Sequence, residues 1–313
     1  MKSYLSLLDD VLHNGEEHRD RTGVGTYSVF GRQWRHDMRQ GFPLLTTKKV
    51  PLRWVFEELR WFLSGTDDEQ RLRDAGVDIW KEWATKEQCA KFGRLQGQLG
   101  PIYGPMMRSF PIGVAMHDNQ LRDNSIVTSA SYDQISALLQ DIIGSPNARR
   151  LIVTHWHPYY AKRVTLPPCH TLWQVKVHEG WSSPDGRGEP DSMSLHLYCR
   201  SIDAFLGLPF NIASYGLLLH MLCAVTHKVP RDLIISFGDL HVYTSHLVAV
   251  KTQLEREPKS LPRLSLIDWG DPSCVVEGDE VRTALNLLLN MQWKNVKLDG
   301  YDPYSKIEAP VAV

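Results

Sequence analysis

The chain has 313 residues, of which 42% are hydrophobic and 23% are charged, as in ordinary globular proteins. This composition excludes an intrinsically disordered protein, a collagen-like repeat and a disulfide-rich miniprotein. The 35 basic and 36 acidic side chains leave a formal charge of -1, so no bulk charge is present to hold a nucleic acid or an acidic membrane. Any anion that the protein binds must be held locally, by a few well-placed cations.

Cysteine usage and the apolar segments favour a soluble protein in the reducing cytoplasm. Five cysteines without a CxxC pair argue against a disulfide framework and against a structural zinc site. No metal, nucleotide-loop or hydrolase motif is present, so we expect no metal. The first twenty residues are charged every few positions, unlike a signal peptide. The longest apolar stretch, 205–225, is interrupted by Pro209, Asn211 and His220, which favours a buried helix over a membrane span.

In the first half of the chain, apolar residues recur at helical spacing in some segments and alternate with polar residues in others. Residues 4–12 predict a helix, and residues 26–38 alternate loosely, as a strand or hairpin does. Residues 51–63 predict a second helix, and residues 78–83 predict an aromatic turn or a short helix. Glycines and prolines predict irregular structure over residues 84–128.

The second half contains longer predicted elements. They are a helix over 132–143, strands over 150–156, 170–177 and 193–201, a long helix over 204–227, a strand over 232–237 and a helix over 243–255. Residues 179–191 are rich in Gly, Ser and Pro and predict an exposed hairpin loop. Because no repeat or low-complexity linker divides the chain, we expect one α+β domain over residues 1–313, with a mixed sheet and a buried central helix.

Cys169 is the first candidate for chemistry. It follows Pro167 and Pro168, which would hold the thiol rigidly at the edge of a strand. A thiol acts as a nucleophile only as the thiolate, which nearby cations stabilise. The neighbouring sequence offers such cations in Arg149, Arg150, Arg163 and His170. A buried, inert cysteine is the alternative interpretation.

Arginines form the second candidate feature. Arg21 lies in a tight loop, Arg149 and Arg150 precede a strand, and Arg200 is followed by Ser201. Guanidinium groups together with a hydroxyl match a phosphate well. The interpretation requires that these side chains converge, and the alternative is that each is a solvated surface residue.

Three further sequence features contain polar side chains that could bind or react. Asn211 lies inside an apolar helical stretch, where its amide could read the edge of a uracil ring or simply cap the helix. The motif GDLHVY, just after a predicted strand, places Asp239, His241 and Tyr243 where they could hold a sugar. Glu58 lies on an aromatic helix, where a raised pKa would suit proton transfer, although a place on the polar face is the alternative.

Several motifs occur together in one order: DRTGVGT, FEELRWFLSG, DIWKEW, GQLGPIYG, RRLIV, LPPCH, YCRSIDAFLGLPFNIASY, GDLHVY and GYDPYSKIEAPVAV. From about residue 20 to residue 313 this series resembles the thymidylate synthase family. The resemblance implies that family's fold, a homodimer whose sheets pack back to back, and folate-dependent one-carbon transfer to carbon 5 of dUMP.

The resemblance also implies roles for individual residues. Cys169 would add to carbon 6 of the uracil, Glu58 would move protons through ordered water, and Asn211 would select uracil over cytosine, since cytosine-using relatives carry Asp there. The implied catalytic set is Cys169, Glu58, Asn211, Asp203, Tyr103 and His170. The implied dUMP-binding set is Arg21, Arg200 and Ser201 for the phosphate, Arg149 and Arg150 from the other subunit, Asn211 for the base, and His241 and Tyr243 for the sugar.

The second substrate implied by the resemblance is methylenetetrahydrofolate. Its site would comprise Trp80, Trp83, Asp203, Leu206, Gly207, Phe210, Lys48, Ala312 and Val313. Closure of this site would exclude water and favour hydride transfer, giving dTMP and dihydrofolate. A dUMP hydroxymethylase, in which water attacks instead, is one alternative, and a regulator that only binds nucleotide or RNA is another.

Five positions depart from the family's usual residues. Met107 stands where tryptophan is usual, and Pro51 and Trp54 stand where His and Ser are usual. Cys199 replaces the usual Gln, and His157 replaces the usual Asn. These positions bear on the preference for a glutamate tail on the folate and on the exclusion of water.

Overall fold

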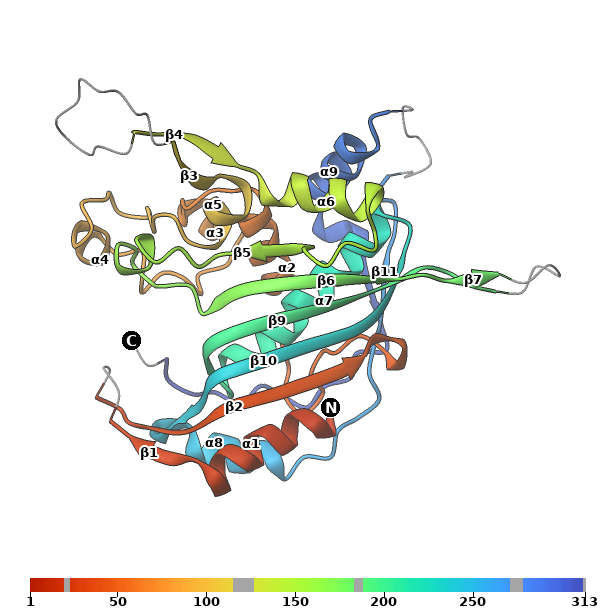
Figure 1. Ribbon diagram of the computed structural model, residues 1–313. Helices are drawn as coiled ribbons and strands as arrows, with labels where there is room; N and C mark the ends of the chain where they lie inside the picture. Colours follow the sequence, from red (N-terminus) through yellow and green to blue (C-terminus); the bar gives the residue numbers. More distant parts are fainter. Residues whose placement is uncertain (20–22, 115–126, 183–187, 271–277, 312–313) are drawn as a thin grey trace.

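The computed structural model describes residues 1–19, 23–114, 127–182, 188–270 and 278–311 (Figure 1). Its α-helices are α1 (Lys2–Asn14), α2 (Leu52–Leu63), α3 (Gln70–Asp74), α4 (Lys86–Ala90), α5 (Tyr103–Arg108), α6 (Gln134–Gly144), α7 (Gly207–Val225), α8 (Leu247–Leu254) and α9 (Glu280–Asn290). Short 3-10 turns are η1 (Met38–Gln40), η2 (Tyr160–Lys162), η3 (Thr244–His246) and η4 (Trp293–Asn295).

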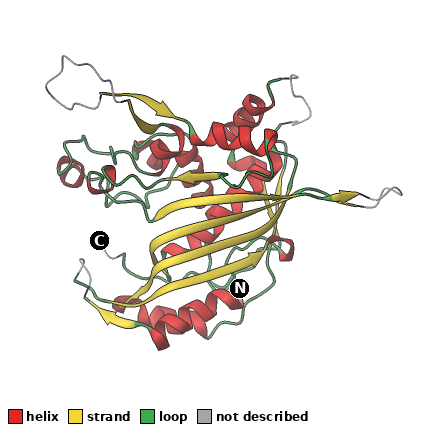
Figure 2. Ribbon diagram, in the orientation of Figure 1, coloured by secondary structure: helices red, strands yellow, loops and turns green. Residues whose placement is uncertain are grey.

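The strands build a central sheet and three small two-stranded sheets. They are β1 (Glu16–His18), β2 (Thr26–Asp37), β3 (Phe110–Val114), β4 (Val127–Tyr132), β5 (Ile152–Thr154), β6 (His170–His178), β7 (Trp181–Ser182), β8 (Gly188–Glu189), β9 (Ser192–Asp203), β10 (Val229–Tyr243), β11 (Arg263–Leu266) and β12 (Val296–Asp299). The central sheet has the order β1-β2-β10-β9-β6-β5 (Figure 2). Its β9–β10 pair is parallel and its other pairs are antiparallel, which confirms the predicted α+β class with a mixed sheet.

Helix α7 lies behind the sheet and forms the centre of the core (Figure 1). It packs on β9, β10 and α2. It is apolar on every side, which is typical of a helix that is buried all round. Among the described residues α7 alone is long and apolar enough to cross a membrane, but 78% of that window is buried inside the protein. This confirms the buried central helix.

Helix α2 carries a carboxylate into this core. Pro51 precedes its first turn, and Gly65, with a backbone φ of +77°, follows its end, as the sequence predicted. The helix buries apolar side chains such as Val55 and Phe56 together with Glu58.

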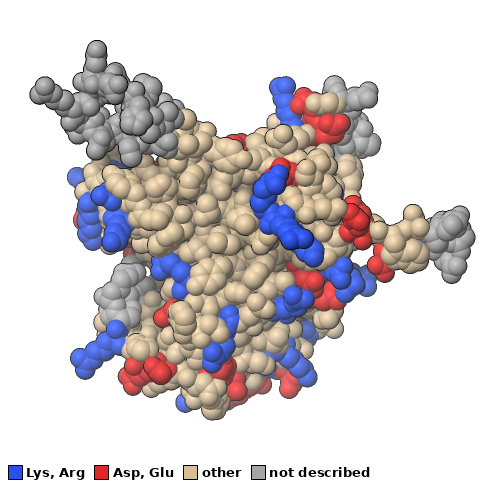
Figure 3. Space-filling view, viewed as in Figure 1, with Lys and Arg blue, Asp and Glu red and all other residues tan. Residues whose placement is uncertain are grey.

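The other face of the sheet points toward the viewer in Figure 1. There Leu172 pairs with Tyr198, and Gln174 pairs with both Ile152 and His196. Leu172, Tyr198 and Ile152 are 39%, 38% and 44% exposed, unusually open for large apolar side chains on a sheet. The same face is largely uncharged in the space-filling view (Figure 3).

The structure corrects three sequence predictions. Residues 84–128 were expected to be irregular, but α4, α5, β3 and part of β4 lie there. The strand predicted over 232–237 runs on to Tyr243, so the motif GDLHVY lies inside β10 and not after it. The helix predicted over 204–227 begins only at Gly207, because the carboxylate of Asp203 holds the preceding turn.

Candidate active site

Cys169 stands immediately before β6 and is half-buried. Its N–H donates to the Tyr103 hydroxyl at 2.8 Å, which fixes the backbone beside the thiol. Arg200 donates from Nε to the Pro168 carbonyl and from Nη2 to the Pro167 carbonyl, both at 2.8 Å. These bonds hold Arg200 Nη2 3.8 Å from Cys169 Sγ. A fixed positive charge at this distance stabilises a thiolate, so the site suits a nucleophile.

The positive charges expected from residues close to Cys169 in the sequence are not found beside its thiol. Burial lowers the pKa of His170 to about 4, so its ring is neutral near pH 7. Arg163 is exposed and stacks on Tyr159, with 3.9 Å between its guanidinium carbon and the ring centroid. Among the described residues, Arg200 lies beside the thiol; it was assigned to phosphate and reaches Cys169 through the pairing of β6 with β9.

Arg149 and Arg150 lie away from the thiol of their own chain. Both are exposed, and the Arg149 carbonyl accepts from Gln174 Nε2 at 2.9 Å. Gln174 is five residues along β6 from Cys169, a distance of about 17 Å in an extended strand. The predicted convergence of arginines is therefore absent within the described part of one chain. Arg21 lies outside the described residues.

Glu58 is buried, so the alternative that placed it on the polar face is wrong. Its Oε1 accepts from Trp80 Nε1 at 2.6 Å. Burial raises the pKa of Glu58 to about 7, with the bond from Trp80 opposing that shift. Both protonation states are thus populated near pH 7, as a group that moves protons requires. The ring of Trp80 packs against Trp61, Phe62, Trp83 and Tyr103.

Asn211 lies near the start of α7 and is 9% exposed. Its side chain lies beside His170, whose Nδ1 lies 3.3 Å from the Tyr215 hydroxyl. Among the described residues, Asn211 Oδ1 is buried and has no hydrogen-bond partner. A buried acceptor without a partner is costly, which points to a donor supplied by a ligand. The ring N–H of a uracil is such a donor.

His241 and Tyr243 lie at the carboxyl end of β10, where His241 pairs with Asp203 of β9. His241 Nδ1 lies 2.7 Å from Asp239 Oδ1, and its ring meets the Tyr243 ring edge-on at 5.2 Å. Asp239 thereby orients the histidine. Ser201 pairs with Asp239 across the same two strands, so Ser201, His241 and Tyr243 lie at one end of the sheet.

Several of the predicted folate residues lie at the turn between β9 and α7. Asp203 Oδ1 accepts the N–H groups of Phe205 and Leu206 at 2.8 and 3.1 Å. Lys48 donates to the Phe205 carbonyl, and its ammonium lies 3.5 Å from the centroid of the Phe205 ring. Burial lowers the pKa of Lys48 to about 7, although Asp203 opposes this. Leu206, Gly207, Phe210 and Trp83 are half-buried.

This donor set fits a pterin, because one oxygen of the Asp203 carboxylate is not used by the turn. The half-buried apolar residues beside it offer a wall for a flat ring. Ala312 and Val313 lie outside the described residues.

The structure shows the surroundings of three of the five residues that depart from the family's usual ones. Met107 is buried in α5, and Cys199 is buried opposite His170 in the sheet. His157 packs between the rings of Phe110 and Tyr160, at 5.6 and 4.9 Å.

Sequence reasoning missed two residues near this site. Tyr215 is buried beside His170, and His246 is buried beside Asp203. A polar side chain at an apolar helical position was the available signal for Tyr215, whereas none was available for His246.

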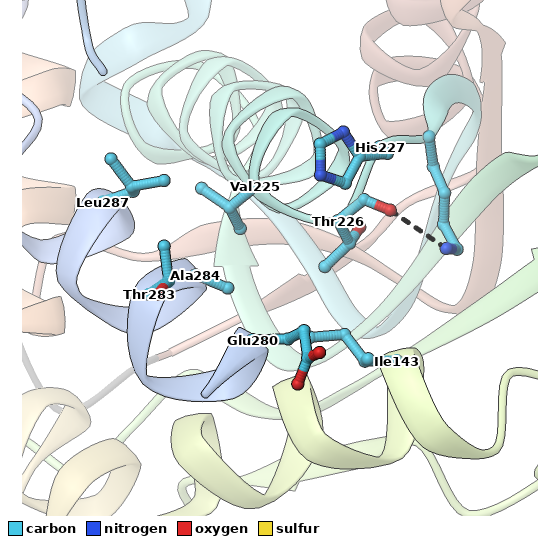
Figure 4. Close-up of a pocket in the computed structure, with 9 residues that line it drawn as sticks. Ile143, Val225, Thr226, His227, Glu280, Thr283, Ala284 and Leu287 are labelled. Carbon is cyan, nitrogen blue, oxygen red and sulfur yellow. Dashed lines mark hydrogen bonds between the residues drawn. The ribbon is translucent and has the colours of Figure 1, made fainter. Parts of the chain in front are cut away.

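A separate pocket lies at the far end of α7 from Asn211 (Figure 4). Its lining is Ile143, Val225, Thr226, His227, Lys228, Glu280, Thr283, Ala284 and Leu287. None of the predicted site residues belongs to it. From residue 211 to residue 225 a helix rises about 21 Å, so this pocket is distinct from the site at Cys169.

The family model described as thymidylate synthase matches residues 2–313, essentially the whole chain. The chain therefore belongs to the thymidylate synthase family.

Proposed function

We propose that this protein methylates dUMP to dTMP, with methylenetetrahydrofolate as co-substrate and dihydrofolate as second product. The family carries out one-carbon transfer to carbon 5 of dUMP. The observation that carries the proposal is the thiol of the half-buried Cys169, held 3.8 Å from Arg200 Nη2. A protein that only bound the nucleotide, or that bound RNA as a regulator, would not need this nucleophile.

The first step is addition to the base. The Cys169 thiolate forms a bond to carbon 6 of the uracil, and the electron pair of the 5,6 double bond moves toward carbon 5 and oxygen 4. Asn211 accepts the N3 hydrogen of the ring with Oδ1 and donates toward oxygen 4 with its amide N–H. Carbon 5 thereby becomes the nucleophile that the reaction needs.

The second stage transfers the carbon. When bound, methylenetetrahydrofolate supplies the one-carbon unit and afterwards the hydride that reduces it. Glu58, with a pKa of about 7, moves protons at the base through water, including the proton that carbon 5 loses. At the end the bond between sulfur and carbon 6 breaks, and the thiolate is restored.

Hydride transfer requires that water be kept from the reactive methylene on carbon 5. Trp80 is 6% exposed and packs among Trp61, Phe62, Trp83 and Tyr103, which supports a dry site. The test is a product assay with dUMP and methylenetetrahydrofolate, followed by absorbance and mass spectrometry. Equal amounts of dTMP and dihydrofolate are expected, whereas hydroxymethyl-dUMP with unoxidised tetrahydrofolate would establish the hydroxymethylase instead.

Asn211→Asp should weaken the selection against dCMP. A carboxylate accepts from the exocyclic amine of cytosine but cannot donate to oxygen 4 of uracil. We expect the ratio of kcat/KM for dUMP to that for dCMP to fall about tenfold or more, since one mismatched buried hydrogen bond costs ~1–3 kcal/mol. Steady-state kinetics with both nucleotides check this. Complete exclusion of dCMP with unchanged use of dUMP would show that Asn211 does not read the base.

We further propose that the active form is a homodimer with shared sites. Ile152, Leu172 and Tyr198 form an exposed apolar face, which a second copy would cover with its own sheet. Arg149 and Arg150 lie about 17 Å along the sheet from Cys169 of their own chain, beyond the reach of a phosphate bound there. Across a twofold axis they would serve the partner's phosphate.

Subunit mixing tests the shared site. Arg150→Ala and Cys169→Ala homodimers should each be nearly inactive, because every site lacks one component. After dissociation and reassociation, a mixture should regain about a quarter of the wild-type activity, since half of the dimers are mixed and each has one complete site. Mixing Arg150→Ala with the wild type, as a control, should show simple averaging of the two activities. No recovery in the first mixture would refute the shared site.

A further inference from the structure

His246 is a buried histidine that none of the proposed roles uses. It ends the turn η3, directly after β10, and its side chain has no exposed surface. Its ring packs between those of Phe205 and Tyr243, with centroids at 5.6 and 5.4 Å. It therefore stands where the proposed sugar and folate subsites meet.

The two ring nitrogens of His246 face two different parts of the chain. Nε2 lies 2.7 Å from the carbonyl oxygen of Pro310. Because a carbonyl can only accept, Nε2 must carry a hydrogen. Nδ1 faces Asp203 Oδ2 at 3.8 Å and, among the described residues, forms no hydrogen bond. One ring thus joins the carboxyl-terminal segment to the carboxylate assigned to the pterin.

The carboxyl-terminal segment is held to the body of the protein at several points. The N–H of Tyr304 donates to the Thr46 carbonyl at 2.8 Å, and Arg256 donates to the Ser305 carbonyl at 2.8 Å. Of these bonds, the one between His246 and Pro310 is the nearest to the carboxyl terminus. The same His246 ring faces Asp203 Oδ2 at 3.8 Å, so this bond connects the segment to the surroundings of Asp203.

We propose that His246 is a positioning residue that couples the carboxyl-terminal segment to Asp203. The proposal rests on the function proposed above. Without the bond from Nε2, the Pro310 carbonyl loses its partner and the segment is no longer held beside Asp203 and Tyr243. Folate would then bind more weakly, and water would reach the methylene on carbon 5 before hydride transfer.

Three substitutions at His246 distinguish the contribution of Nε2 from that of Nδ1. His246→Gln places an amide N–H near the position of Nε2 and can still donate to Pro310. His246→Asn reaches only to the position of Nδ1, and His246→Leu removes both polar atoms. His36→Leu is the matched control, because His36 is also buried and its Nε2 lies 2.9 Å from the Gly41 carbonyl. His36 pairs with Leu233, ten residues along β10 from Tyr243, or about 34 Å away.

The assay uses dUMP labelled with tritium at carbon 5, whose release reports carbon transfer, alongside dihydrofolate formation. For His246→Leu and His246→Asn we expect KM for methylenetetrahydrofolate to rise about tenfold, as for one lost buried hydrogen bond. The ratio of tritium released to dihydrofolate formed should exceed one, and the dissociation constant of dUMP should change less than about twofold. His246→Gln and His36→Leu should match the wild type in all three quantities.

Hydrogen exchange of the peptide covering residues 302–313 provides a readout that needs no activity. Exchange should be faster in His246→Leu and His246→Asn than in His246→Gln, His36→Leu and the wild type. Equal exchange in all five proteins, or a tritium ratio of one in His246→Leu, would overturn the coupling. A wild type that makes no dTMP but shows the exchange pattern would overturn the proposed function alone.

Discussion

Cys169→Ala should abolish dTMP formation while leaving the fold and dUMP binding intact. The residue is half-buried, and the bond from its N–H to Tyr103 does not depend on the side chain. Removal of an enzyme nucleophile lowers kcat by roughly 10⁴-fold or more, because the covalent route is lost. The measurement is a rate assay together with isothermal titration of dUMP.

A second measurement tests the covalent step directly. Rapid quenching followed by intact-mass spectrometry should show wild-type protein heavier by one dUMP and Cys169→Ala protein without that adduct. Cys223→Ala is the control, since Cys223 is buried near the end of α7 and away from the site. It should retain both the activity and the adduct. Full activity of Cys169→Ala would rule out the covalent mechanism.

The candidate nucleophile was chosen from its local setting, but the cation that lies beside it in the structure could not be found in that way. Local sequence offered Arg163 and His170, and the structure places Arg200 at the thiol instead. Arg200 is 31 residues from Cys169 and reaches it because β6 and β9 pair side by side. A contact of this kind depends on strand register, which hydrophobic periodicity does not specify across separate elements.

The sequence prediction also made β10 too short, because the length of this strand depends on contacts with its neighbouring strands. The strand predicted over residues 232–237 stopped just before Gly238, yet β10 runs through this glycine to Tyr243. A Cβ atom built at Gly238 would lie 2.6 Å from the Arg200 carbonyl oxygen. Glycine is needed here for the close approach of two backbones, and it does not mark a turn. The same register brings the sugar residues beside Asp203.

Apolar periodicity identified α2, and a long apolar run identified α7, although α7 begins at Gly207 and not at residue 204. Neither pattern could find α5, whose six residues include a glycine and a proline and are held by burial of Tyr103, Met106 and Met107. The aromatic surroundings suggested a raised pKa for Glu58, but its burial and its bond to Trp80 required the structure.

Glu58→Gln should lower the catalytic activity and raise the free energy of unfolding. Both effects follow from the burial of Glu58. The amide can neither release nor take up a proton, so we expect kcat to fall roughly 10²- to 10⁴-fold, the usual contribution of general acid–base catalysis. The transition near pH 7 that Glu58 gives the wild-type pH–rate profile should be absent from the residual activity. Glu57→Gln is the control, since Glu57 lies next along α2 and pairs with Arg60 at 3.7 Å. It should retain activity.

The effect of Glu58→Gln on stability has a defined sign and pH window. Burial raises the pKa of Glu58 from 4.5 to about 7, so between these values the folded state binds more protons than the unfolded state. The free energy of unfolding of the wild type therefore falls as pH rises through this window, by about 3 kcal/mol in all for this one group. The uncharged Gln side chain does not titrate, so the variant does not lose this part of its free energy of unfolding as pH rises. Relative to wild type, the variant should therefore gain up to about 3 kcal/mol between pH 4 and pH 8, measured by urea unfolding. A stability difference that does not grow with pH would show that Glu58 is not buried as a largely neutral carboxyl, and its assignment to proton transfer would lose its physical basis.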